Sequence, residues 1–87
     1  MQVLKLLNQE TNLTASSDVS GATLVRVFNN QNAQSALMVK DSTDTTILGS
    51  FTMAAYEIIY IQKITDQKLS ASTGGSNVKV TKIAFAN

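Results

Sequence analysis

Hydrophobic positions in the segment Tyr56–Lys63 are filled by β-branched and aromatic residues, three isoleucines and two tyrosines. Its isoleucines and tyrosines fit the pleated surface of a strand better than a helix, so the pattern predicts a strand, which we expect at the centre of its sheet. Successive side chains of a strand point to opposite faces, which places Ile59 and Ile61 on one face and Ile58 and Tyr60 on the other. Because both faces are apolar, one is expected to enter the core. The other needs a cover from the same chain or from a partner.

A helix over Met53–Lys63 is the alternative interpretation. Apolar residues also recur there at helical spacing, and Ala54-Ala55 are good helix formers. Against the helix, β-branched and aromatic residues are crowded together and capping residues are missing at both ends. The strand interpretation is therefore preferred.

Short apolar segments separated by polar, turn-forming residues recur along the rest of the chain. They predict strands at Gln2–Leu7, Thr23–Phe28, Ala36–Lys40, Phe51–Met53 and Val78–Phe85. The second and third of these are expected to pair as a hairpin across Asn29–Asn32. The pattern predicts one all-β domain over residues 1–87, a small antiparallel sandwich or barrel-like domain of about six to eight short strands.

The N-terminal residues Met1–Leu7 have two interpretations. They form either a first strand of the domain or an arm that adds a strand to a neighbouring molecule. Val3, Leu4 and Leu6 are accordingly candidate partner contacts. The apolar run is too short for a signal peptide or a membrane span, so a soluble protein without a membrane partner is expected.

Charge and composition narrow the function classes. Seven Lys and Arg balance six Asp and Glu, for a formal net charge of +1, and the basic residues are scattered. A surface that follows nucleic-acid phosphates needs clustered basic residues, so nucleic acid is not expected as a partner. The chain has no His and no Cys, which removes the commonest general base and the commonest zinc ligands. We expect no enzyme activity, no metal and no cofactor.

Two polar segments resemble ligand loops only superficially. Asp41 and Asp44 lie in a Ser- and Thr-rich stretch, but the glycine and glutamate of a calcium loop are absent at the required spacing. A turn in which an Asp side chain binds nearby amides is the expected structure. Gly74-Gly75 precedes a predicted strand, and no Gly-Lys-Ser follows, so it is interpreted as a turn and not as a phosphate loop.

Polar and aromatic residues on the predicted strands provide the remaining candidate contacts. Arg26 is the only arginine, and it lies mid-strand among apolar residues. It is either a solvent-facing residue or the anchor of an interface, where Arg is enriched. Tyr56, Ile58 and Tyr60 share one face of the strand and form either core with hydroxyls at the rim or a contact patch.

Several segments together resemble small structural proteins of tailed phages, particularly marine and cyanobacterial ones. The resemblance is carried by Gly21–Asn29, Gly49–Met53, Glu57–Lys63, Thr65-Asp66, Leu69–Ala71 and Val78–Phe85. The chain differs from that pattern at Ala54-Ala55, where a turn with proline or glycine is expected.

The resemblance implies a β domain that decorates or cements a capsid. The implied partners are the major capsid protein and further copies of the chain in a homo-oligomer, located on the capsid surface of the virion after synthesis in the host cytoplasm. A tail or fibre module that binds host glycans is the alternative. The resemblance implies no catalytic residues.

Overall fold

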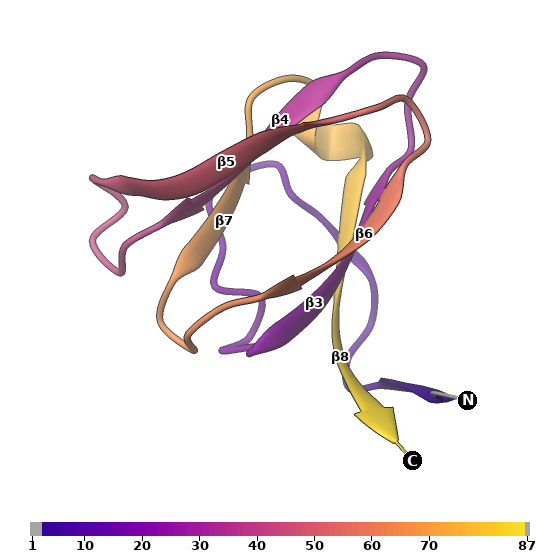
Figure 1. Cartoon of the computed structure of the whole chain (residues 1–87), viewed down its shortest axis with the longest axis vertical. Coiled ribbons are helices and arrows are strands. Elements are labelled where there is room, and N and C mark those ends of the chain that lie inside the picture. Colours follow the sequence, from indigo (N-terminus) through magenta and orange to yellow (C-terminus); the bar gives the residue numbers. More distant parts are fainter. Residues whose placement is uncertain (1–2, 87) are drawn as a thin grey trace.

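A computed structural model describes residues 3–86, so Met1, Gln2 and Asn87 of the predicted 1–87 domain lie outside the described residues. Eight strands and one short 3-10 helix occur in this part of the chain (Figure 1). They are β1 (Val3–Leu6), β2 (Thr11–Asn12), β3 (Leu24–Asn29), β4 (Ser35–Lys40), β5 (Ile47–Met53), β6 (Ile58–Gln62), β7 (Lys68–Ala71), η1 (Gly75–Asn77) and β8 (Val78–Ala86). The predicted all-β class is confirmed.

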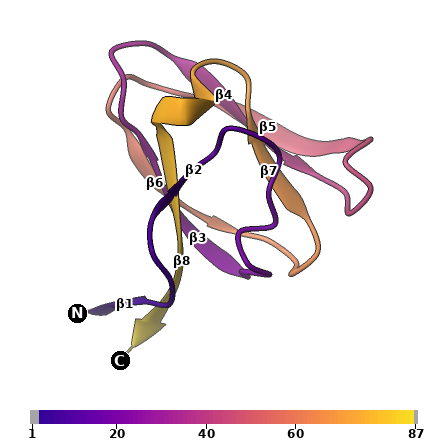
Figure 2. The same cartoon turned by 180° about the vertical axis from the view of Figure 1, so that it is seen from behind.

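The strands form two antiparallel sheets. The first has the order β1-β8-β3-β6, with β2 also paired to β8, and the second has the order β5-β4-β7. A bridge between Ser17 and Leu69 ties the segment after β2 to β7, which joins the two sheets along one side. β1 and the end of β8 extend away from the two-layer body as a ribbon (Figures 1 and 2).

The core lies between the sheets and is built from side chains that alternate along the strands. Val25 and Val27 of β3 are fully buried, and their neighbours Leu24, Arg26 and Phe28 face the other way. The period of two in the sequence therefore matches the burial of this strand. The other buried members of the cluster are Leu13, Val19, Ala22, Leu37, Met53, Leu69, Val78 and Val80.

The predicted central strand occupies a different place. β6 spans only Ile58–Gln62, and it lies at the edge of its sheet, where β3 is its partner within the described residues. β3 and β8 hold the middle instead. The prediction of a central position was wrong because β6 has a paired strand on one side only. Its two apolar faces also differ: Ile59 and Ile61 pack against the core, while Ile58 and Tyr60 stay exposed.

The predicted hairpin between the second and third apolar segments is also wrong. β3 pairs with β6 and β8, whereas β4 pairs with β5 and β7 in the other sheet. The polar connection from Asn30 to Gln34 therefore crosses between layers. Loop length and turn residues alone do not distinguish such a crossing from a hairpin.

Buried Asn29 holds this crossing in place. Its side-chain amide nitrogen donates to the carbonyl oxygens of Ala33 at 2.9 Å and Ala54 at 2.8 Å, and its oxygen accepts from Gln31 at 2.8 Å. The residue is 0 % exposed, so each of these bonds replaces one that water makes in the unfolded chain. One side chain thus connects the loop after β3 to the loop after β5.

We predict that Asn29→Ala lowers the free energy of unfolding by about 2–4 kcal/mol, because it removes three buried hydrogen bonds and leaves two carbonyls without their donor. The measurement is urea unfolding followed by circular dichroism. Asn30→Ala is the matched control, since Asn30 is exposed and its hydrogen bond to Asn77 uses the main chain. Equal midpoints for the two variants would contradict the assigned role.

Candidate partner-binding face

The outward surface of the first sheet is the strongest candidate site. Cross-strand register places Tyr60 beside Arg26 and Arg26 beside Thr81, and places Leu4 beside Phe85. Side chains of directly opposed residues in an antiparallel pair lie on the same face of the sheet. We call this surface the outer face, and its residues are Leu4, Leu6, Arg26, Phe28, Ile58, Tyr60, Thr81, Ile83 and Phe85.

The outer face exposes large apolar side chains. Leu6 is 66 % exposed, Tyr60 51 %, Ile58 46 % and Phe85 38 %. The rings of Tyr60 and Phe85 meet edge to face, with centroids 5.5 Å apart. Single exposed apolar residues are common on proteins, but a group of them on one sheet face marks a surface that can bind another molecule.

Arg26 lies in the middle of this face. Its guanidinium is an ion-pair partner of Glu10, with Nη1 3.3 Å from Oε2, and it lies over the ring of Phe28 at 5.7 Å from the centroid. The side chain of Arg26 is 24 % exposed and that of Glu10 is 44 % exposed. The charge of Arg26 is therefore paired, and Lys79, opposite Phe28 on the same face, donates through its ammonium to the side-chain oxygen of Asn12.

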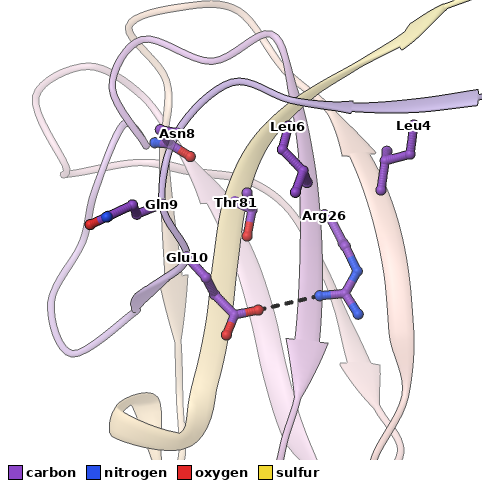
Figure 3. Close-up of a pocket in the computed structure, with 7 residues that line it drawn as sticks. All are labelled: Leu4, Leu6, Asn8, Gln9, Glu10, Arg26 and Thr81. Carbon is purple, nitrogen blue, oxygen red and sulfur yellow. Dashed lines mark hydrogen bonds and ion pairs between the residues drawn. The ribbon is translucent and has the colours of Figure 1, made fainter.

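A surface hollow of about 590 Å³ adjoins the ion pair. Leu4 and Leu6 form its apolar side, and Asn8, Gln9 and Glu10 form its polar side, with Arg26 and Thr81 between them (Figure 3). The segment on the polar side is positioned by β8, because the amide of Lys82 donates to the side-chain oxygen of Asn8 and the amide of Leu7 donates to the carbonyl of Lys82. The hollow can accept a side chain with an apolar body and a polar end.

Five of the seven contact residues predicted from the sequence lie on the outer face: Leu4, Leu6, Arg26, Ile58 and Tyr60. Val3 points to the opposite side of the β1 ribbon, since neighbouring strand residues alternate. Tyr56 is not part of the strand. It lies in the turn Ala54–Glu57 with φ of 60°, a left-handed conformation that glycine adopts more easily. A turn therefore lies at Ala54–Glu57, with tyrosine at its positive-φ position.

Sequence reasoning did not name Glu10, the ion-pair partner of Arg26, or four members of the outer face: Phe28, Thr81, Ile83 and Phe85. Phe28 and Phe85 were visible as strand aromatics, and the alternation of their strands put them on definite sides. Glu10 lay in a polar segment without a hydrophobic period, so no signal connected it to Arg26. Glu10 and Arg26 meet because of the strand order, which brings residues 16 positions apart in the sequence into an ion pair.

A buried lysine, Lys63, directly follows the last residue of β6. Lys63 is 6 % exposed, and its ammonium donates to the carbonyl oxygens of Ile64 at 3.3 Å and Thr65 at 3.5 Å. Burial lowers the pKa of Lys63 from its ordinary value, while Asp18 and Asp66 act against that shift. We interpret it as a structural residue of the turn that follows β6.

Other chemistry is sparse in the part of the chain that the structure describes. Residues 3–86 contain no group of three or more acidic side chains placed to hold a metal ion. No helix among them is long and apolar enough to cross a membrane. Comparison with protein-family models, curated proteins and solved structures finds no match for this chain.

The expected Asp turn is confirmed at Asp41. Its carboxylate accepts from the backbone amides of Thr45 at 3.0 Å and Thr46 at 3.3 Å and from the hydroxyl of Thr43 at 3.0 Å. The amide of Thr45 is the largest cause that lowers the pKa of Asp41 from 3.8 to about 2. The carboxylate therefore organises the β4–β5 connection through these hydrogen bonds.

We predict that this connection loosens in acid. A carboxyl whose pKa is lowered by folding stabilises the folded state above its unfolded pKa and loses that effect as pH falls toward its folded pKa. Protection factors of the Thr45 and Thr46 amides, which correct for the intrinsic pH dependence of exchange, should fall between pH 3.8 and about 2, where Asp41 takes up its proton. Hydrogen exchange monitored by NMR measures this. Asp41→Asn keeps the acceptor oxygen without titrating, so an identical acid response in that variant would contradict the assignment.

Proposed function

We propose that this chain is a virion structural protein of a tailed phage, a capsid decoration (cement) protein that binds the outer capsid lattice and stabilises it. The observation that carries the proposal is the outer face, where exposed apolar side chains surround a neutralised, half-buried Arg26. Interfaces concentrate their binding energy in aromatic and arginine side chains surrounded by apolar contacts. The resemblance of the sequence to small phage structural proteins names the partner, the major capsid protein.

The composition of the surface supports a lattice partner. More than a third of the residues are Ser, Thr, Asn or Gln, and the formal net charge is +1. Contacts made by apolar packing and neutral hydrogen bonds depend little on salt, which suits permanent attachment to a particle. The proposed role needs no catalysis, no cofactor and no nucleic acid or membrane contact. It includes copies of the chain as additional partners in a homo-oligomer on the virion.

A tail or fibre module that binds glycans is the second candidate. The edge-to-face pair of Tyr60 and Phe85 lies on the same face as a hollow lined by Asn8, Gln9 and Glu10. Aromatic rings with polar side chains nearby provide both surfaces that a sugar needs, an apolar face and hydrogen-bonding groups.

We predict that Tyr60→Ala weakens binding to capsids that lack the protein by roughly 30-fold, the effect of a central aromatic contact worth about 2 kcal/mol. The measurement is co-sedimentation of the purified protein with such capsids over a concentration series. Tyr56→Ala is the matched control, because Tyr56 is 57 % exposed against 51 % for Tyr60 but lies in a turn away from the face. Retained binding by Tyr60→Ala would contradict the use of the outer face.

The cementing role has its own test. Capsids saturated with the protein should release their contents at a higher temperature than bare capsids, because a ligand that binds only the assembled state stabilises it. Scanning fluorimetry with a DNA-binding dye measures the release. Equal release temperatures would refute cementing, and selective binding on a glycan array would then favour the second candidate.

A further inference from the structure

The outer edge of β6 is an open strand edge. The amide of Lys63 donates to Thr23 and the amide of Asn29 donates to the carbonyl of Glu57, so these positions direct their main-chain groups toward β3. Hydrogen-bonding direction alternates along an antiparallel strand. The N–H and C=O groups of Ile58, Tyr60 and Gln62 therefore point away from β3, into the space beyond the sheet.

This edge lacks the features that usually block strand addition. Such features are proline, a bulge, or a charged residue within the strand. β6 has none of them between Ile58 and Gln62, and its register with β3 is continuous. The other edge strands each carry one such feature: β5 has a register shift opposite Val39 and Lys40, β1 carries Lys5, and β7 carries Lys68.

The residues around Tyr60 are complementary to the same residues read in reverse. If two copies of β6 pair antiparallel with Tyr60 opposite Tyr60, the two strands align over Ile58–Gln62. Ile59 then faces Ile61, and Ile58 faces Gln62. Paired β-branched side chains directly across an antiparallel pair are favourable.

We infer that β6 is the dimer interface of this protein, where a second copy adds its own β6 antiparallel about a twofold axis at Tyr60. The outward groups of Ile58, Tyr60 and Gln62 meet their counterparts in three hydrogen-bonded pairs, which contribute about six main-chain bonds. Pairs of this kind keep each outer face on the same side of the sheet. The dimer therefore presents one continuous outer face, twice the size of the face on a single chain.

Charge favours pairing of two copies through β6 over pairing through β1. Two copies of β1 joined by the outward groups of Leu4 and Leu6 place Lys5 directly opposite Lys5 of the second copy. Like charges at such a position are destabilising. At β6 the corresponding inward positions carry the uncharged residues Ile59 and Ile61.

The side chains at this edge also gain cover. Ile59 and Ile61 are only half-buried, and Ile61 and Gln62 border a second hollow, of about 230 Å³, whose other lining includes Leu37, Val39 and Phe51. A neighbouring strand removes part of this apolar surface from water, which favours association. The edge that is weakest in the single chain becomes the middle of the dimeric sheet.

Removal of one outward amide tests the pairing. Gln62→Pro removes the N–H that points away from β3, and an edge strand tolerates proline at such a position. Gln62→Thr shortens the side chain but keeps the N–H, and it is the matched control. Sedimentation velocity of the full chain over a concentration series should show dimers for the native protein and for Gln62→Thr. For Gln62→Pro the dimer Kd should be at least about tenfold higher, because each copy loses one main-chain hydrogen bond.

Cysteine placement tests the register independently, since the chain has no Cys of its own. Opposed residues in a hydrogen-bonded antiparallel pair have Cα atoms about 5.5 Å apart, within disulfide range. Tyr60→Cys should therefore form a disulfide-linked dimer under mild oxidation. Ile58→Cys should not, because two copies of residue 58 are offset by four positions, about 13 Å along the strand.

The two experiments overturn the inference if the native chain sediments as a monomer at every concentration, or if Gln62→Pro dimerises as tightly as Gln62→Thr. Equal cross-linking at positions 58 and 60 also overturns it, because it indicates a dimer joined through the outer faces. If Gln62→Pro loses its β-sheet circular dichroism, the cysteine pair decides alone. The inference rests on the homo-oligomer part of the proposed function, and these readouts need no capsid, so its failure is distinguishable from failure of capsid binding.

Discussion

The structure depends on inward packing of aliphatic side chains between two short sheets without any covalent support. Val25 and Val27 on β3 and Val78 and Val80 on β8 are nearly inaccessible to solvent, and they meet Leu37 and its neighbours from the opposite sheet. A domain of this size gains only a few kcal/mol from one core, and this chain has no disulfide to add to it. Every strand that stays half-covered is therefore a cost to the isolated molecule.

That constraint explains why polar residues have structural roles in the loops. Asn29 connects two loops through three hydrogen bonds, and Asp41 organises a third loop through backbone amides. Both residues satisfy main-chain groups at the places where strands leave the sheets. Because these groups cannot all pair within a sheet, side-chain oxygen and nitrogen atoms replace the missing partners.

The same constraint relates the fold to its proposed role. The core uses one face of the β1-β8-β3-β6 sheet, and the other face keeps Leu6, Tyr60 and Phe85 at the surface around the Arg26–Glu10 pair. A small domain has too few residues to cover a sheet on both sides. The proposed association with a capsid, or with a second copy, would bury the apolar side chains that the single chain leaves exposed.

The sequence by itself determined the class of fold and the faces of individual strands. Alternation of apolar and polar residues depends only on local geometry, so the side on which Arg26 or Tyr60 lies followed from its position in the strand. The Asp41 turn was equally local, since its bonds span at most five residues. Five of the seven predicted contact residues share the outer face for this reason.

Only the tertiary structure decided which strand lies at an edge, which segments pair, and which distant residues meet. Strand order follows from the packing of all the segments together, so a strongly apolar segment such as Ile58–Gln62 was placed at the centre on local grounds and lies at the edge in fact. Tyr56 lies outside the strand because the chain turns there with positive φ. Glu10 lies beside Arg26 because β1 and β2 both pair with β8, and this long-range pairing has no local signature in the sequence.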